Sequence, residues 1–329
     1  MSWSGISPTS APASLSRLSA NGAHVSPPTS LEDDAATQSI TAENASFESE
    51  ANAYSHTGDE VAESKSHPAL SLEAIALSFG GVTAIDGVDL VIQPGEIRAI
   101  IGPNGAGKSS LINVMSGIYR PDRGRVHIGG RSFSRVPTHR LARLGVARTF
   151  QNLALFAGLS VFDNVAIARV AFRRAGFIEQ MIGLGRARRE ERDARERAAA
   201  IIEFLDLGSV RDRLAGALPY GLQKRVELAR ALVARPKILL LDEPMAGMTA
   251  TEKREMAGFV RAARDEYGTT VILIEHDIGV VLGLSDRVAV LDYGRKIADG
   301  PPDTVRRDPA VIEAYVGVAH EEQTTEGAR

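Results

Sequence analysis

A glycine-rich segment beginning at Gly102 has the residue types and the spacing needed to hold a phosphate group. It follows the apolar run 97–101 and precedes residues 111–115, which are apolar at helical spacing, so a strand, a tight turn and a helix are expected in that order. The glycines let successive backbone N–H groups point inward, and the start of the helix adds free N–H groups and its positive dipole end. Lys108 then reaches the β- and γ-phosphates, and the Ser109 hydroxyl holds Mg²⁺. The segment predicts a nucleoside triphosphate site; the alternative is an ordinary glycine turn between a strand and a helix. The residues predicted to bind the nucleotide here are Gly102, Pro103, Asn104, Gly105, Ala106, Gly107, Lys108, Ser109 and Ser110.

Four polar residues elsewhere each follow or end a stretch that is predicted to be a strand: Gln151, Asp242, Glu243 and His276. In an open α/β sheet, ligands bind at the carboxyl ends of the strands, so these side chains are expected to meet around one phosphate. Asp242 is placed to hold Mg²⁺ through a water, and Glu243 to polarise the attacking water as a general base. We expect Gln151 to complete the Mg²⁺ shell and His276 to contact the γ-phosphate. Each residue alone also has a structural reading, and their order relative to the glycine-rich segment is what favours a site.

Phe79 ends the predicted strand 70–79 and lies 29 residues before Lys108. An aromatic ring in that position can stack on a nucleotide base, although a lone aromatic residue is more often part of the core. Phe79 is therefore a candidate contact for the base.

Composition limits the classes to which this chain can belong. With 329 residues, 44% of them hydrophobic, it exceeds one average domain and can bury a sizeable core. Residues 1–67 carry nine acidic residues against one arginine and one lysine, a net charge of −7, which leaves +4 of the overall −3 for the rest. That mild excess of positive charge gives no reason to expect a nucleic-acid partner.

Cysteine is absent from the sequence, which excludes disulfides and thiolate metal sites and fits a reducing cytoplasm. No apolar run approaches the roughly 18 residues of a membrane span, and the N-terminus lacks the basic start and apolar core of a secretory signal. Any role at a membrane is therefore expected to come through partner proteins.

Residues 1–67 are rich in Ser, Ala, Thr and Pro and show no sustained periodicity. Such a segment buries too little apolar surface to offset its ordering entropy, so we predict a disordered, solvated leader; the alternative is a regulatory or docking tail.

The rest of the chain alternates strand and helix patterns, with no internal repeat. Ser160 is predicted to cap a helix that runs to about residue 170, as the first residue of a capping box. The Arg- and Glu-rich stretch 173–197 predicts a solvated helix face with i,i+4 pairs, and contact with a partner or with lipid head groups is the alternative. Strands are expected at 70–79, 88–92, 97–101, 124–128, 146–150, 237–242, 269–275, 287–292 and 295–298. Further helices are expected at 137–144, 226–234 and 252–267, with two short helices before a frayed end at 319–329.

Together these motifs make residues 70–316 resemble an ATP-binding cassette (ABC) ATPase. Gly102–Ser109 match the Walker A motif, residues 238–243 match Walker B with its catalytic Glu, and Gln151, His276 and Phe79 match the Q-loop, the H-loop and the adenine-stacking aromatic. The resemblance implies an α/β fold: a P-loop NTPase (RecA-like) core with an N-terminal antiparallel β subdomain and an inserted α-helical subdomain. The expected boundaries are a tail at 1–67, an ABC ATPase domain at 68–318 with its helical subdomain at about 153–225, and a flexible end at 319–329.

The resemblance also implies a dimer of cassettes that sandwiches two ATP molecules. Each ATP is bound by the Walker motifs of one subunit and by the signature of the other, with Gly221 facing the partner's γ-phosphate. The signature here departs from the usual Leu-Ser-Gly-Gly-Gln, and Thr249 replaces the usual acidic or amide residue of the D-loop, so a weaker half-site and altered communication across the dimer are expected. The residues matched are Pro219, Tyr220, Gly221, Leu222 and Gln223 of the signature and Ala246, Gly247, Met248 and Thr249 of the D-loop.

Within the family the chain is most similar to an ATPase subunit of branched-chain amino acid (LIV-type) importers. The marks are Arg148-Thr-Phe-Gln-Asn, the Tyr-Gly signature, residues 274–277, and the ending from Gly300 through Tyr315-Val-Gly. The resemblance implies ATP and Mg²⁺ as cofactors, two permease subunits and a second ABC ATPase as partners, an extracytoplasmic binding protein acting indirectly, and a place at the cytoplasmic face of the cell membrane. A heterodimer of cassettes is favoured over a homodimer. The alternatives are a soluble ABC ATPase without a transporter and a nucleotide-binding module with weak hydrolysis.

Overall fold

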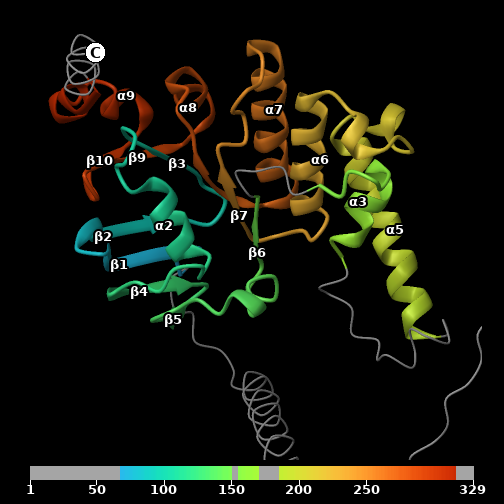
Figure 1. Cartoon of the computed structure of the whole chain (residues 1–329), viewed down its shortest axis with the longest axis horizontal. Coiled ribbons are helices and arrows are strands. Elements are labelled where there is room, and N and C mark those ends of the chain that lie inside the picture. Colours follow the sequence, from blue (N-terminus) through green and yellow to red (C-terminus); the bar gives the residue numbers. More distant parts are fainter. Residues whose placement is uncertain (1–66, 150–154, 170–184, 316–329) are drawn as a thin grey trace, which may run out of the picture. The chain divides into compact units, whose positions relative to one another are not determined.

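The computed structural model describes residues 67–149, 155–169 and 185–315. The chain divides into two units, Met1–Ser64 and Lys65–Arg329, and every described residue belongs to the second. In that unit the described strands form two sheets, and the helix labelled α2 (Lys108–Met115) lies beside the smaller one (Figure 1).

The smaller sheet is antiparallel, with the strand order β2-β1-β4-β5. Two glycines, Gly80 and Gly81, join its first two strands with φ of 53° and 89°, values that suit the tight turn of a hairpin. Ala74 also has a positive φ, and the pairing register shifts beside it, so a bulge keeps Ile75 on the buried face. The strands are β1 (Leu70–Phe79), β2 (Val82–Ile92), β4 (Arg123–Ile128) and β5 (Arg131–Phe133).

The larger sheet has the order β10-β9-β3-β8-β7-β6 and is parallel except at the β9–β10 hairpin. All residues of β3, β7 and β8 are buried, as expected for central parallel strands covered on both faces. The strands are β3 (Ile97–Ile101), β6 (Val146–Arg148), β7 (Ile238–Asp242), β8 (Thr270–Ile274), β9 (Arg287–Asp292) and β10 (Arg295–Gly300).

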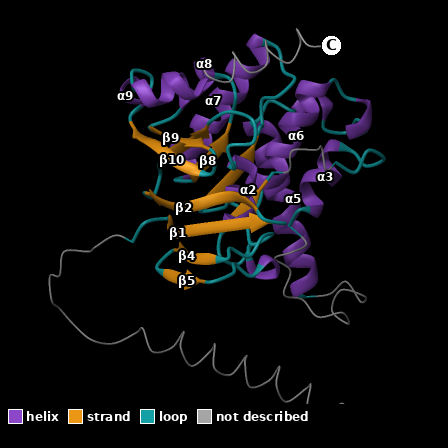
Figure 2. Cartoon of the chain, turned by 60° about the vertical axis from the view of Figure 1, so that its left-hand side comes forward, coloured by secondary structure: helices purple, strands orange, loops and turns teal. Residues whose placement is uncertain are grey.

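The larger sheet divides the core into two hydrophobic clusters. On one face, Ile100 and Leu240 pack with α2 and with the buried face of the antiparallel sheet. On the other face, Ala99 and Leu241 pack with the remaining helices, which Figure 2 shows in purple beside the orange strands. Four of these helices are α6 (Tyr220–Leu232), α7 (Ala250–Tyr267), α8 (Ile278–Leu284) and α9 (Pro302–Val305).

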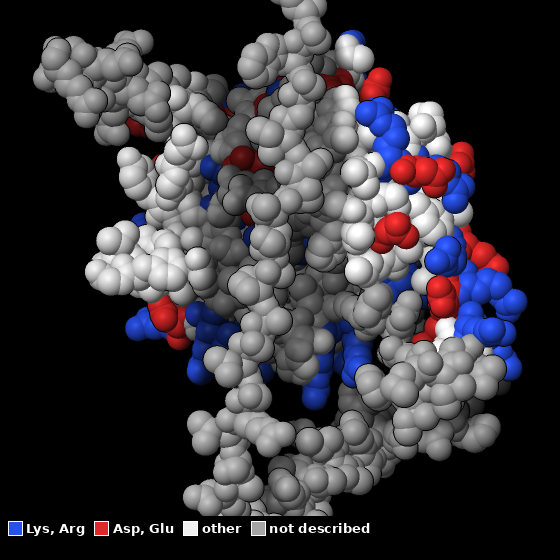
Figure 3. All heavy atoms as spheres, turned by 45° about the vertical axis from the view of Figure 1, so that its right-hand side comes forward, with Lys and Arg blue, Asp and Glu red and all other residues white. Residues whose placement is uncertain are grey.

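Two further helices, α3 (Val161–Ile167) and α5 (Arg186–Phe204), lie between β6 and β7 in the chain and pack against each other (Figure 1). Three i,i+4 pairs run along α5, which confirms a solvated and paired face for the described part of the stretch 173–197, whereas 173–184 lie outside the described residues. The pairs are Arg192–Glu196, Arg195–Glu191 and Arg197–Asp193. On the right-hand side of Figure 3, Lys and Arg side chains are interspersed with Asp and Glu. The three paired arginines of α5 give no separate reason to expect an anionic partner.

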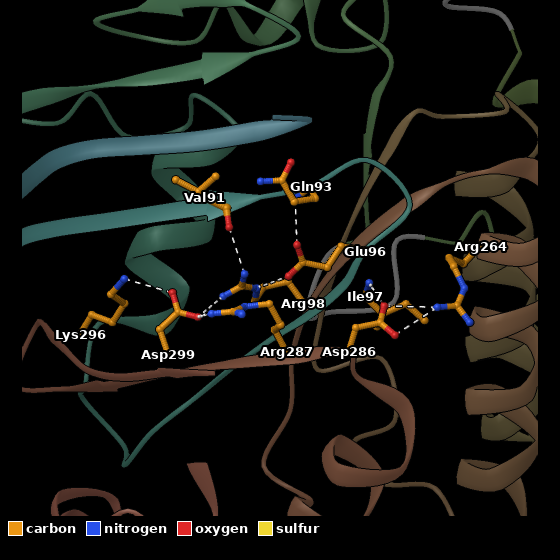
Figure 4. Close-up of polar contacts among 10 residues, drawn as sticks. All are labelled: Val91, Gln93, Glu96, Ile97, Arg98, Arg264, Asp286, Arg287, Lys296 and Asp299. Atoms are coloured by element: carbon orange, nitrogen blue, oxygen red, sulfur yellow. Dashed lines mark hydrogen bonds and ion pairs between the residues drawn. The ribbon is translucent and has the colours of Figure 1, made fainter. Parts of the chain in front are cut away.

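The buried Arg98 connects the two sheets near the amino end of β3 (Figure 4). Its guanidinium donates to Glu96 at 2.6 Å, to the Val91 carbonyl of β2 at 3.0 Å and to Asp299 of β10. Asp299 also accepts hydrogen bonds from Arg287 and Lys296, both at 3.1 Å. Burial acts to raise the pKa of Asp299, but the surrounding cations hold it below its ordinary value. We refer to these five side chains, of Glu96, Arg98, Arg287, Lys296 and Asp299, as the Arg98 clamp.

A pocket of about 300 Å³ lies over the Arg98 clamp. Its lining comes from β2, β3, β9, β10 and the turn before β3, and includes none of the residues predicted to bind nucleotide. This pocket is therefore separate from the residues predicted to bind nucleotide.

Several predicted elements differ from those observed. β2 begins at Val82, before the expected 88, because the hairpin pairs its first half with β1. The helix expected at 137–144 is reduced to a 3₁₀ turn at Thr138–Arg140, within a short connection that leads into β6. Ser160 caps α3 as predicted by accepting from the Asp163 N–H at 3.0 Å, but the helix ends at Ile167. β5 and α8 were not predicted.

Candidate active site

The glycine-rich segment connects β3 to α2, which confirms the strand, turn and helix predicted from the sequence. Gly102 and Gly107 have φ of 149° and 97°, and neighbouring backbone leaves no room for a side chain at either position. A Cβ on Gly102 would lie 2.0 Å from the Leu291 carbonyl oxygen, and one on Gly107 would lie 2.4 Å from that of Ala84. Gly107 is the N-cap of α2 and supplies no side-chain cap, so the first N–H groups of the helix have no side-chain acceptor there.

Lys108 is buried, and its ammonium folds back onto the loop that precedes it. Nζ donates to the carbonyl oxygens of Gly102 at 2.7 Å and Pro103 at 2.8 Å. Burial lowers the pKa of Lys108, while the charges of Glu243 and Asp242 act to raise it. Two neutral carbonyls compensate a buried cation less well than a charged phosphate would, so the position of the Lys108 ammonium is suited to binding an anion.

Asp242 is the last residue of β7, and its side chain is 4% exposed. Oδ2 accepts a hydrogen bond from Arg148 at 3.1 Å, whereas Oδ1 is buried and has no hydrogen-bond partner among the described residues. Burial raises the pKa of Asp242, and Arg148 opposes that rise. A buried carboxylate oxygen without a partner is an acceptor available to a hydrated cation, which is the role predicted for this residue.

Glu243 and His276 lie together, at the ends of the neighbouring strands β7 and β8. Oε1 of Glu243 is 2.7 Å from Nε2 of His276, and the Glu243 N–H donates to the Ile274 carbonyl at 3.1 Å. Glu243 has φ of 51°, a left-handed conformation that costs about 1–3 kcal/mol in a residue other than glycine. The fold therefore retains a strained glutamate in contact with the histidine, as expected of a site rather than of a simple turn.

A second buried carboxylate, Glu275, was not among the predicted site residues. Its Oε1 accepts from the Met245 N–H at 2.8 Å, and Oε2 accepts from the His276 N–H at 3.3 Å. Burial raises the pKa of Glu275, and these backbone donors act against that rise. Glu275 thus ties the loop after β7 to the loop after β8. The signal for it in the sequence is the same as for Asp242, an acid that ends an apolar strand.

Phe79 is 45% exposed at the end of β1 and packs edge-to-face on Tyr119, with ring centroids 5.1 Å apart. Tyr119 therefore holds the Phe79 ring in position, and part of the Phe79 ring remains exposed to solvent. Gln151 lies outside the described residues, so its predicted place beside the phosphate stays a prediction.

The signature and D-loop residues meet within this chain, at the start of α6. Pro219 is the N-cap of α6 and has no side-chain cap. A Cβ on Gly221 would lie 2.1 Å from Glu252 Oε1, and one on Gly247 would lie 3.2 Å from the ring of Tyr220. Thr249 forms a capping box with Glu252 at the start of α7. Among the remaining signature and D-loop residues, Gln223 donates to the Leu218 carbonyl, Leu222 packs on the core, Met248 is buried and Ala246 donates to the Glu243 carbonyl.

The fold of this chain is similar to that of crystal structures of ATP-binding cassettes. One, a nucleotide-free cassette from an ABC transporter, is 33% identical with a TM-score of 0.66, covering 75% of this chain and 98% of that one. Another, an ABC transporter cassette in its ADP conformation, is 34% identical with a TM-score of 0.67, covering 76% and 99%. The family model described as "ABC transporter" matches residues 85–246, and the chain belongs to this family of ATPases.

Within the family, the chain is similar to proteins named for branched-chain amino acid transport. A second model, "Branched-chain amino acid ATP-binding cassette transporter", matches residues 295–321. The transport ATP-binding protein BraF of Pseudomonas aeruginosa is 39% identical over 254 residues, which are 77% of this chain and 100% of BraF. LivG of Escherichia coli K12 is 38% identical with the same coverage, and a probable LivG of Archaeoglobus fulgidus is 34% identical over 77% of this chain and 97% of that protein. Tyr315 lies within the segment that the second model matches; burial raises the pKa of Tyr315, and the backbone of Gly102 acts against that rise.

Proposed function

We propose that this chain is the ATP-hydrolysing subunit of an ABC importer for branched-chain amino acids or related small polar solutes. One observation carries the proposal: BraF and LivG, which are 38–39% identical, are matched over their full length, and both are named as branched-chain amino acid transport proteins. The match of a subfamily model to residues 295–321 supports the same reading, since it lies outside the part matched by the general family model.

The proposed nucleotide site combines the glycine-rich loop, Lys108 and the side chains at the ends of β7 and β8. Backbone N–H groups at 102–110 and the Lys108 ammonium hold the phosphates, and Phe79 contacts the base. Glu243 accepts a proton from the attacking water, and His276 holds the carboxylate that does so. Ser109, Gln151 and Asp242 are the residues proposed to hold Mg²⁺, and Oδ1 of Asp242, which has no hydrogen-bond partner among the described residues, fits that role. When bound, Mg²⁺ neutralises charge on the phosphate oxygens.

The proposed assembly contains two permease subunits and a second cassette, with an extracytoplasmic binding protein acting indirectly, at the cytoplasmic face of the cell membrane. Every helix in the described part of the chain is too short or too polar to cross a bilayer, so membrane attachment in this proposal is through the permeases. The signature residues 219–223 then contact the ATP of the second cassette. ATP favours the closed pair and hydrolysis reopens it, because the nucleotide states differ in affinity for the closed form.

A heterodimer of cassettes is proposed over a homodimer because Pro219, Tyr220 and Leu222 replace three residues of the usual signature. Pro219 removes the serine hydroxyl but occupies the N-cap of α6, where its missing N–H is tolerated. If the two half-sites are unequal, Pro219→Ser in the assembled pair raises the turnover rate. An unchanged rate together with a stable, active homodimer contradicts the heterodimer.

The decisive experiment combines co-purification with transport. The full chain, extracted from its native membrane in mild detergent, is expected to retain two permease subunits, and vesicles containing the complex are expected to take up labelled leucine only with ATP. An ATPase that is active but retains no membrane protein would support the soluble alternative. Nucleotide binding without Mg²⁺-dependent hydrolysis in the assembled complex would support the binding-only alternative.

A further inference from the structure

Arg148, the last residue of β6, lies between two elements of the candidate site. Its NH2 group donates to Oδ2 of Asp242 at 3.1 Å, and its NH1 group donates to the Ser116 hydroxyl at 2.6 Å. The three residues are far apart in the sequence: Arg148 is 32 positions from Ser116 and 94 positions from Asp242. One guanidinium therefore joins the end of β7 to the residue that follows α2.

The ion pair is buried on both sides, with the side chains of Arg148 and Asp242 7% and 4% exposed. Removing a carboxylate and a guanidinium from water is costly, and the geometry compensates for it only when hydrogen bonds use the charged groups well. Here the pairing is one-sided, because Arg148 occupies Oδ2 of Asp242 while Oδ1 has no partner among the described residues. The arrangement orients the carboxylate and leaves one oxygen for another ligand.

The NH1 group of Arg148 contacts the C-terminal end of α2, the helix that carries Lys108 and Ser109 at its start. Ser116 is the C-cap of α2, and its hydroxyl donates in turn to the Ile112 carbonyl at 2.9 Å. α2 is only eight residues long, so fixing its last turn relative to Asp242 also limits where its first turn can lie. Ser109 and Asp242, both proposed to hold Mg²⁺, are thereby tied together through Arg148.

We propose that Arg148 is a positioning residue for Mg²⁺ in this cassette: it orients Asp242 and fixes α2 against β7, so that Ser109 and one Asp242 oxygen are held ready for the ion. This inference rests on the nucleotide site of the proposed function and adds to it a residue outside the Walker motifs. Groups that orient metal-binding carboxylates typically affect metal affinity about 10- to 100-fold when removed.

The test measures how strongly Mg²⁺ and ATP favour each other's binding to the purified full chain. The dissociation constant of ATP is measured with Mg²⁺ and with EDTA, by displacement of a fluorescent ATP analogue. The constant in EDTA divided by the constant in Mg²⁺ reports how much the metal tightens ATP binding. In Arg148→Met we expect this ratio to fall by about tenfold or more, with little change in the EDTA value. Arg148→Lys keeps the charge but cannot bridge both partners, so it should restore part of the ratio.

Two further variants separate positioning from general stability. Ser116→Ala removes the hydrogen bond between Arg148 and α2 while Arg148 keeps its ion pair with Asp242. We therefore expect the ratio to fall in this variant too, but by less than in Arg148→Met. Arg98→Met removes another buried arginine from a carboxylate pair, at the opposite end of the sheet, and should reduce the melting temperature without changing the ratio.

The outcomes are distinct. If Arg148→Met binds Mg²⁺·ATP more tightly, the arginine competes with the metal for Asp242, and the proposal is wrong. An unchanged ratio in a folded Arg148→Met or Ser116→Ala protein also overturns it. If the unaltered chain binds no ATP, the proposed nucleotide site itself is wrong. If the unaltered chain binds ATP and the ratio is unchanged in the variants, only the role of Arg148 is wrong.

Discussion

The two ends of the parallel sheet both bury charged side chains, but they pair them differently. Near the amino end of β3, Arg98 donates to two carboxylates and a carbonyl, and Asp299 accepts from three cations (Figure 4). At the carboxyl end, within the described part of the chain, Lys108 donates to two loop carbonyls and Asp242 has one oxygen without a partner.

The difference separates charges that hold the fold from charges that await a ligand. Buried polar groups are normally hydrogen-bonded, so two features among the described residues call for an explanation: a carboxylate oxygen without a partner and a buried lysine whose hydrogen bonds go to neutral carbonyls. The strained backbone of Glu243 lies at the same end. We therefore expect substitutions at the carboxyl end to impair nucleotide chemistry, and those at the amino end to reduce stability.

The largest effect on chemistry is expected at Lys108. Lys108→Ala removes the buried ammonium from the proposed phosphate site, and ATP turnover should fall at least about 10²–10³-fold, as for other preorganised charge-stabilising groups. The measurement is phosphate release by the assembled complex, with chemical denaturation of the chain as the control for folding. Retained turnover would refute the site and remove the contrast between the two ends.

Glu243→Gln should also abolish most turnover, by about 10²–10⁴-fold, because the amide cannot accept a proton from water. Binding of ATP, measured by equilibrium displacement, should be retained, which distinguishes this variant from Lys108→Ala. Rapid hydrolysis by the glutamine variant would assign the general base elsewhere.

Arg98→Met tests the amino end of the sheet, where the buried charges are expected to stabilise the fold. It leaves the buried Glu96 without its ion-pair partner and removes one of the three cations around Asp299, so the free energy of unfolding should fall by about 3–5 kcal/mol. The dissociation constant of Mg²⁺·ATP should be unchanged while the protein is folded. A variant of full stability that no longer binds nucleotide would show that the clamp belongs to the site.

The smallest effect is expected at Thr249. Thr249→Ala removes the capping box of α7 and should cost about 1 kcal/mol in urea unfolding. Thr249→Asp keeps an N-cap acceptor and introduces an acid of the kind usual in the D-loop, so stability should be retained. A change in turnover by the aspartate variant alone, measured in the assembled pair, would assign the D-loop threonine a role across the dimer.

Much of the fold could be predicted because its signals are local. The apolar run before Gly102 and the turn glycines identify β3, the loop and α2 from a short stretch of chain, and the acids that end β7 follow the same logic. β5 and α8 escaped prediction because three and seven residues are too few to show a period. The expected helix at 137–144 is largely absent, since helices this short depend on packing more than on sequence pattern.

Residue identity and order along the chain were enough to indicate the type of site, since phosphate-binding loops and strand-end acids are set by backbone geometry within a few residues. Pairing between side chains was decided by the tertiary structure. Nothing in the spacing of Ser116, Arg148 and Asp242 indicates that one guanidinium joins them, or that Glu275 ties two loops together. Such contacts depend on which strands become neighbours and on how deeply each charge is removed from water, and both are properties of the assembled sheet.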